Sequence, residues 1–98
     1  MTLSIINQVI RTTEEDGRHT AGMSLYLFGS VASGANIHKD VDVLLVYPSG
    51  HLNHAHDLAE ALRQLEVYPP IEVLALSQDE EEEADFVRTQ RAVQLWPS

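Results

Sequence analysis

The sequence contains no cysteine, which excludes disulfide bonds, thiolate metal sites and thiol catalysis. Aromatic residues make up only 6% of the 98 residues, and basic residues are scarce, with 6 lysines and arginines against 15 aspartates and glutamates. The resulting net charge of −9 opposes binding to nucleic acid or to an anionic membrane through counterion release. We therefore do not expect direct nucleic-acid binding; a basic protein partner, or a substrate screened by metal ions, fits this charge better.

Long apolar runs are also absent. No segment reaches the roughly 20 consecutive apolar residues that a membrane-spanning helix needs, and the N-terminus lacks the charged-then-apolar order of a signal peptide. These absences predict a cytoplasmic protein. A hydrophobic content of 44% over 98 residues is enough for one compact core but not for a second lobe. We therefore expect residues 1–98 to form a single domain, which binds its substrate with the help of another molecule.

Hydrophobic periodicity predicts that helices and strands alternate along the chain. The expected elements are a helix over residues 2–15, a strand over 24–28, a short helical turn over 30–34, a strand over 41–46, a helix over 53–66, a strand over 71–76 and a last helix over about 78–94. Ser77 and Glu80 have the spacing of a capping box at the start of that last helix. This order predicts an α/β or α+β fold, with a small three-stranded mixed sheet flanked by helices.

Connection lengths predict how these strands pair. The strands over 41–46 and 71–76 are joined through a helix, which favours parallel pairing by a right-handed crossover. The shorter link between 24–28 and 41–46 favours antiparallel pairing. Because parallel strands start at the same edge of a sheet, Glu72 is expected to lie beside the carboxylates at the start of the preceding strand.

Those carboxylates are Asp40 and Asp42. Side chains at positions i and i+2 of a strand point to the same face, so the pair is able to hold one cation, or two adjacent ones, together. A carboxylate within an apolar strand is costly to bury without a partner. This cost favours cation binding by the pair over two simpler roles, a loop cap for Asp40 and an edge-facing polar residue for Asp42. Gly29 and Ser30 would let backbone N–H groups approach a phosphate closely. Glu72 is either a third ligand or a solvent-facing strand residue.

These residues together resemble the minimal nucleotidyltransferase domains of the DNA polymerase beta superfamily. The resemblance extends over most of residues 24–76, and it implies the catalytic-core fold of polymerase beta. The matching positions, in chain order, are Gly29-Ser30, Gly34, Asp40-Val41-Asp42 and Glu72.

The resemblance implies transfer of a nucleoside monophosphate, AMP from ATP, to an acceptor hydroxyl, with release of pyrophosphate. Two Mg²⁺ ions would be held by three carboxylates, with Asp40 and Asp42 as shared ligands. Glu72 would hold an ion near the acceptor and take the acceptor's proton. Ser30, with the backbone around Gly29, would contact the outer phosphates.

Three positions depart from the family pattern. Glu72 stands where aspartate is usual, and the loop after Ser30 lacks the arginine that many relatives carry. Lys39 or His38 would substitute for that arginine. Lys39 also replaces the more frequent serine before the first aspartate, where it would pair with Asp40 or face the nucleotide. Glu72 and the missing arginine favour a second hypothesis, in which the chain is a catalytically degenerate antitoxin or regulatory binding module.

The resemblance is to stand-alone transferases encoded beside helical toxin proteins in toxin–antitoxin pairs, so the implied acceptor is a helical partner protein. A homo-oligomer is the other arrangement that would supply a missing lobe. Addition of nucleotides to an antibiotic or to RNA is a third hypothesis, which requires a further helical domain from a partner or a dimer.

Other features have simpler interpretations. The histidines His51, His54 and His56 fit no strong metal-ligand template, which favours solvated side chains over a second metal site. The acidic run over residues 79–85 complements the positive end of the last helix, or binds a basic partner. Trp96 anchors the last helix on the core or lies in an interface.

Overall fold

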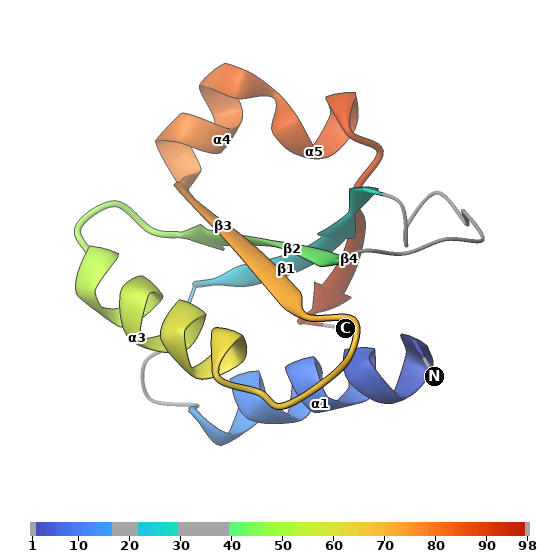
Figure 1. The fold of residues 1–98 in the computed structure, drawn as a ribbon. Helices are drawn as coiled ribbons and strands as arrows, with labels where there is room; N and C mark the ends of the chain where they lie inside the picture. The colour runs from blue at the N-terminus through green and yellow to red at the C-terminus, as the bar shows by residue number, and fades with distance from the viewer. Residues whose placement is uncertain (1, 17–21, 30–39, 98) are drawn as a thin grey trace.

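The computed structural model describes residues 2–16, 22–29 and 40–97. Its helices are α1 (Thr2–Glu15), α3 (Leu52–Arg63), α4 (Gln78–Ala84) and α5 (Phe86–Thr89). Its strands are β1 (Ser24–Phe28), β2 (Val41–Tyr47), β3 (Ile71–Ser77) and β4 (Val93–Trp96). The first helix and all three predicted strands are confirmed to within one residue, whereas the helical turn predicted over 30–34 lies outside the described residues (Figure 1).

The strands form a mixed sheet in the order β3-β2-β1-β4. β1 and β2 are antiparallel and β2 and β3 are parallel, so both predicted pairings are confirmed. The prediction of three strands is wrong, because β4 adds a fourth by pairing antiparallel with β1. β3 and β4 are therefore the two edges of the sheet.

The last helix predicted over 78–94 is also wrong. α4 ends after seven residues because Asp85 adopts a left-handed backbone with a φ of 52°. The Glu81 carboxylate accepts a hydrogen bond from the Val87 N–H, which stabilises the start of α5. Arg91 is the second residue with a positive φ, and after it the chain extends into β4. The two left-handed residues thus break a continuous helical pattern into two short helices and a strand.

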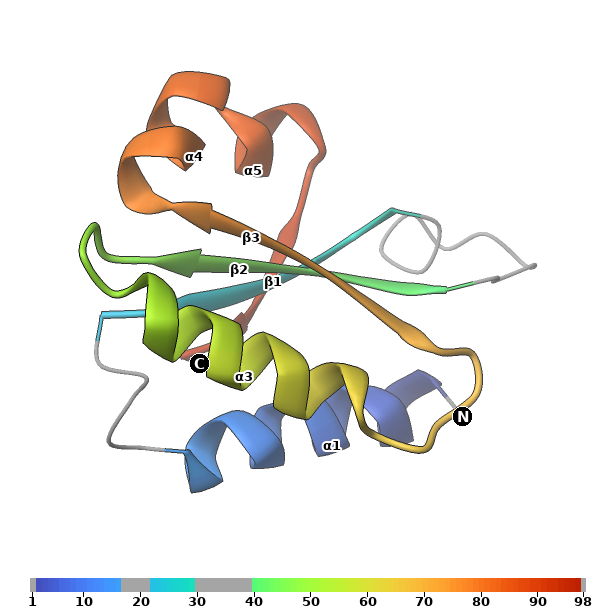
Figure 2. The ribbon, with the colours of Figure 1, turned by 60° about the vertical axis from the view of Figure 1, so that its left-hand side comes forward.

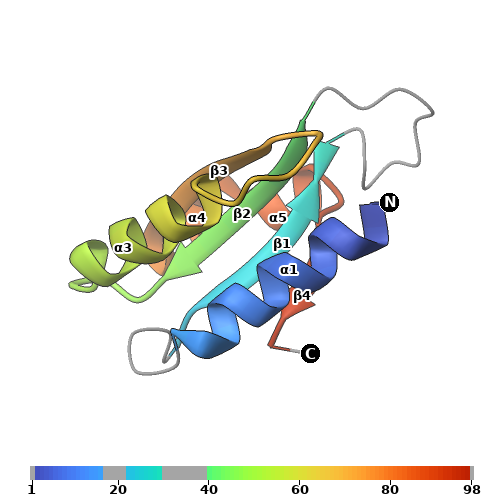
Figure 3. The ribbon, with the colours of Figure 1, turned by 60° about the horizontal axis from the view of Figure 1, so that its bottom comes forward.

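Helices cover both faces of the sheet. α1 and α3 lie side by side across one face, and α4 and α5 lie on the other (Figures 1, 2 and 3). The main core lies between the sheet and the helix pair formed by α1 and α3. Its fully buried residues include Val9, Leu25, Val43, Leu45 and Leu58. Leu95 and Trp96 of β4 pack against this core, so Trp96 anchors the C-terminal segment. No helix in the described parts of the chain is long and apolar enough to cross a membrane.

The predicted capping box is confirmed at the junction of β3 and α4. The Ser77 hydroxyl accepts a hydrogen bond from the Glu80 N–H at 3.1 Å, and the Glu80 carboxylate accepts one from the Ser77 N–H at 2.9 Å. Three acidic residues stand in the first turn of α4, where they complement the positive end of the helix as predicted. The reciprocal bonds fix the direction in which α4 leaves the sheet.

We expect Ser77→Ala to lower the free energy of unfolding by about 1 kcal/mol, the usual cost of losing an N-cap side chain. Urea denaturation followed by circular dichroism measures this change. Ser77→Thr retains the hydroxyl and is the matched control. An equal loss in both variants would contradict the capping role and assign the effect to packing at the end of β3.

Candidate functional site

The predicted acidic residues lie at the same end of the sheet, where β2 and β3 begin and β1 ends. In the strand ladder, Asp42 lies between Phe28 of β1 and Glu72 of β3. The parallel pairing of β2 and β3 is what brings Glu72 to this position, as the sequence predicted. The three chain segments therefore place a carboxylate pair and the end of β1 in a single row across the sheet.

Asp42 and Glu72 point to the face of the sheet that bears α4 and α5. Their neighbours Val41, Val43 and Ile71 belong to the core on the opposite face, and successive strand residues alternate between faces. Asp42 is half-buried, while Glu72 at the edge of the sheet is exposed. The second face therefore carries the charged groups and remains reachable from solvent at Glu72.

Gly29 makes room for the Asp42 carboxylate. Its backbone has a φ of 77°, a conformation that favours glycine, and it directly follows β1. A Cβ at this position would overlap Oδ2 of Asp42 and lie 3.0 Å from its Cγ. The sequence predicts that Gly29 allows close approach of a phosphate; in the structure, a side chain here would also displace a candidate metal ligand.

The carboxylates also interact through their charges. The pKa of Asp42 is raised above its ordinary value of 3.8, first by burial and then by repulsion from Asp40 and Glu72. Asp40 immediately precedes β2 and is half-buried. The Val41 N–H, between the two aspartates, donates to the Pro70 carbonyl at 2.9 Å, which ties the start of β2 to the segment that leads into β3. Asp42 is therefore the centre of a crowded negative site.

This donor set suits a hard divalent cation, although it is not a closed cage. Within residues 2–16, 22–29 and 40–97, no three His, Cys, Asp or Glu side chains converge closely enough to hold a metal ion by themselves. Mg²⁺ prefers oxygen ligands and usually binds through one or two carboxylates together with waters and substrate phosphates. The crowded carboxylates therefore fit Mg²⁺ that arrives with a nucleotide better than Mg²⁺ alone. The predicted contacts of Ser30 and Lys39 lie outside the described residues.

The histidines do not add a second metal site in the part of the chain that the structure describes. The His51 and His54 rings lie edge to face with centroids 5.7 Å apart. His51 and His56 are exposed and His54 is half-buried. The interpretation of solvated histidines holds for the two exposed rings.

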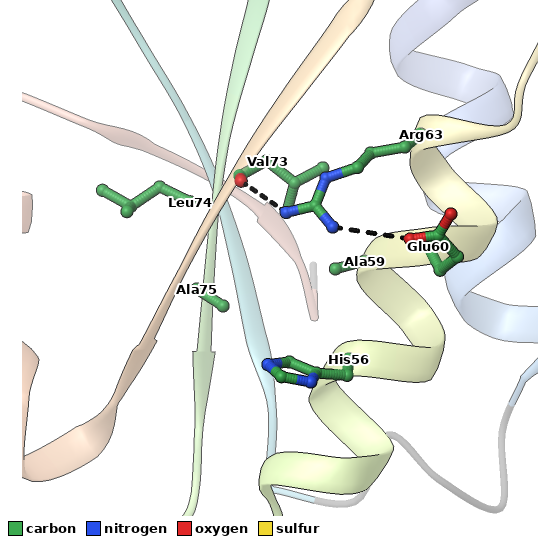
Figure 4. A pocket seen from close by; sticks show the side chains of 7 residues that line it. All are labelled: His56, Ala59, Glu60, Arg63, Val73, Leu74 and Ala75. Carbon is green, nitrogen blue, oxygen red and sulfur yellow. Dashed lines mark hydrogen bonds and ion pairs between the residues drawn. The ribbon is translucent and has the colours of Figure 1, made fainter.

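Two further features were not visible from the sequence. The Phe28 ring, next to Asp42 in the ladder, packs edge to face against Phe86 of α5 with centroids 5.0 Å apart. A cleft of about 360 Å³ lies between α3 and β3, where Arg63 donates to the Val73 carbonyl at 3.0 Å (Figure 4). Phe86 was missed because the helical pattern over 78–94 predicted one long helix there. The contact from Arg63 depends on how α3 crosses the sheet, which no local pattern encodes.

Comparison with known protein families identifies a match over most of the chain. The family model described as a nucleotidyltransferase domain matches residues 6–94. No curated protein and no solved structure matches significantly. The matched region includes β1, β2 and β3 and therefore all the described residues of the candidate site.

Proposed function

This chain belongs to the nucleotidyltransferase domain family, and we propose that it transfers AMP from ATP to a hydroxyl of a partner protein. The observation that carries the proposal is the row of Gly29, Asp42 and Glu72 at one end of the sheet, with Asp40 beside it. Negative charge crowded on a half-buried carboxylate is unfavourable by itself, and it favours a cation that a triphosphate would bring.

In the proposed reaction, the acceptor oxygen attacks the α-phosphorus, and the bond from that phosphorus to the bridging oxygen of the departing pyrophosphate breaks. Two Mg²⁺ ions, bound through Asp40, Asp42 and Glu72 together with phosphate oxygens, would neutralise the triphosphate and lower the pKa of the acceptor hydroxyl. Glu72 is exposed at the edge of the sheet, so it is the carboxylate best placed to meet the acceptor and accept its proton. Ser30 and Lys39 are proposed to contact the phosphates.

A protein acceptor agrees with the charge of the chain. The net charge of −9 repels a nucleic-acid backbone, whereas it attracts a basic protein surface. We propose a helical partner, such as the toxin of a toxin–antitoxin pair, as the molecule that completes the substrate site. A homo-oligomer would supply the same missing surface.

The decisive experiment follows the label of α-³²P-ATP in the presence of Mg²⁺, the purified protein and the product of the neighbouring gene. We expect label on the partner protein and none when EDTA replaces Mg²⁺. Transfer that continued at full rate in EDTA would contradict the metal-dependent reaction. A partner left unlabelled by a protein that still binds Mg²⁺–ATP would contradict this choice of acceptor.

We expect Mg²⁺ and ATP to bind together. Mg²⁺ alone should raise the melting temperature little, because the described carboxylates do not form a closed cage. Mg²⁺ with ATP at about 100 times its Kd should stabilise the fold by about 2.7 kcal/mol. Differential scanning fluorimetry with each ligand alone and with both measures this difference. Full stabilisation by Mg²⁺ alone would instead indicate a preformed site.

A regulatory binding module is the second candidate function. The observation in its favour is that the described carboxylates do not converge on one point, and Glu72 stands where the family usually has aspartate. Such a module would bind the partner protein with the same affinity whether or not Mg²⁺–ATP is present. Binding measured by calorimetry in both conditions, alongside the labelling assay, separates the module from the enzyme.

A further inference from the structure

β3 is an edge strand of seven residues, and no other strand in the described parts of the chain pairs with the side of its backbone that faces away from β2. The Val41 N–H bonds to the Pro70 carbonyl, so in this parallel ladder Glu72, Leu74 and Leu76 direct their backbone groups toward β2. Val73 and Ala75 direct theirs outward. We call this outward side of residues 71–77 the β3 edge.

Two contacts agree with this assignment. The Val73 carbonyl accepts its hydrogen bond from Arg63, and the Ser77 N–H donates to Glu80. Among the described residues, no hydrogen bond engages the N–H of Val73 or of Ala75. Arg63 is the residue that covers the edge, and it is loosely held: its side chain is 47% exposed, and its ion pair with Glu60 is 3.7 Å long.

An added strand would find a surface on both sides. Side chains alternate along a strand, so half of those of an added strand would face the cleft between α3 and β3 and half would face Glu72 and Leu74. The cleft has room for side chains, with a volume of about 360 Å³ (Figure 4). On the other side, Leu74 is 39% exposed, two residues beyond Glu72 on the same face. The β3 edge therefore leads directly into the candidate site.

The charges indicate which occupant fits. Glu60 and Glu72 are exposed beside the β3 edge, and Arg63 is the only arginine or lysine that the described residues place there. The whole chain carries a net charge of −9. A second copy of this chain would bring the same negative charges to the edge and be repelled. A segment rich in lysine or arginine would be attracted, and it would meet outward N–H and C=O groups that give affinity independent of its sequence.

We propose that the β3 edge binds an extended, positively charged segment of the acceptor protein as an additional strand, with a hydroxyl side chain on the Glu72 face as the group that receives the nucleotide. This inference rests on the proposed function for the chemistry, but the strand addition itself requires no nucleotide. It assigns the acceptor as an extended basic segment of the proposed helical partner, rather than one of its folded helices, a sugar or an antibiotic.

The test uses short synthetic peptides in which lysines alternate with threonine or valine around one tyrosine, and matched peptides with glutamate in place of lysine. Amide hydrogen exchange of the ¹⁵N-labelled protein is followed by NMR. We expect the lysine peptides to slow exchange at Val73 and Ala75 by at least about tenfold, as hydrogen bonding of exposed edge amides requires. The glutamate peptides should have no effect.

Ala75→Pro removes one outward N–H and keeps the ladder with β2, because proline is tolerated where the N–H of an edge strand faces solvent. It should weaken binding of the lysine peptides by about tenfold, the equivalent of one lost backbone hydrogen bond. Ala75→Ser keeps the N–H and is the control, with affinity within about twofold of the parent protein. The exchange measurement on the unaltered protein tests the proposal even where Ala75→Pro does not fold.

Each unfavourable result contradicts a different part of the two proposals. A protein that binds Mg²⁺–ATP but shows no peptide-dependent protection at Val73 and Ala75 overturns the strand addition and leaves the proposed function standing. Protection of the same amides in the peptide-free protein, with a doubled mass in solution, identifies a second copy as occupant and also overturns it. Protection by the lysine peptides without any labelling of their tyrosine or threonine hydroxyls supports the binding mode and contradicts the proposed transfer.

Discussion

Asp42→Asn is expected to abolish nucleotidyl transfer while raising the stability of the protein. Asparagine has nearly the same shape, but it removes the charge at the centre of the carboxylate row, so the proposed Mg²⁺ ions lose their shared ligand. A loss of at least about 10³-fold in rate, or about 4 kcal/mol of transition-state stabilisation, is reasonable for such a ligand. The α-³²P-ATP labelling assay measures it.

The gain in stability follows first from the burial of the Asp42 carboxylate and then from the repulsion that Asp40 and Glu72 exert on it. Removing an unfavourable charge commonly stabilises by about 0.5–2 kcal/mol, and in a chain of this size 1 kcal/mol raises Tm by about 4–8 °C. Because the folded-state pKa of Asp42 is raised, its ionisation destabilises the fold at neutral pH, and this destabilisation disappears as the pH falls through the raised value. The difference in Tm between the two proteins should therefore shrink on acidification and vanish below the ordinary pKa of 3.8.

Glu83→Gln is the matched control, because Glu83 is exposed on α4 and its removal changes the net charge equally. It should leave both transfer and Tm nearly unchanged. If Glu83→Gln stabilised the protein as much as Asp42→Asn, the gain would come from net charge and not from the carboxylate row. If Asp42→Asn kept full transfer, the proposed role of Asp42 would be excluded.

The sequence was sufficient to predict the core of this arrangement. The alternation around Asp42 and the helical crossover between β2 and β3 together placed Glu72 beside it, and the ladder pairs these two residues directly. Both inferences rest on rules of strand geometry and chain connection that tertiary contacts rarely override. The capping box at Ser77 was predictable for the same reason, since it depends only on residues close in the chain.

The C-terminal third was not predictable from local pattern. The break at Asp85 depends on a left-handed conformation, which aspartate tolerates better than most non-glycine residues but adopts at only a small fraction of its positions. β4 exists because β1 offers it an edge, and its four residues have no strong strand pattern of their own. Phe86, which packs on Phe28 beside the site, was consequently missed.

Gly29→Ala is the second change with a large expected effect. Alanine at a φ of 77° carries a backbone cost of about 1–2 kcal/mol, and its Cβ would overlap Oδ2 of Asp42. Crowding of this kind typically costs a further 1–3 kcal/mol, so we expect a loss of about 2–5 kcal/mol in the free energy of unfolding. Because the carboxylate must move to make room, transfer should fall by about 10²-fold, the usual effect of misplacing a reacting group by about 1 Å.

Gly50→Ala separates the two causes. Gly50 has a similar φ of 89°, but no atom lies within 4 Å of the place that an alanine methyl would take. Gly50→Ala therefore carries the backbone cost without the overlap, and it should leave transfer unchanged. The overlap is tested further by placing Gly29→Ala in an Asp42→Ala background, where its cost should fall toward that of Gly50→Ala. The difference between the two backgrounds, measured by urea denaturation, is the coupling energy of the pair and should be about 1–3 kcal/mol. A coupling energy near zero would mean that Gly29 serves the turn alone; a large one would establish that glycine is required there because the carboxylate occupies the space of a side chain.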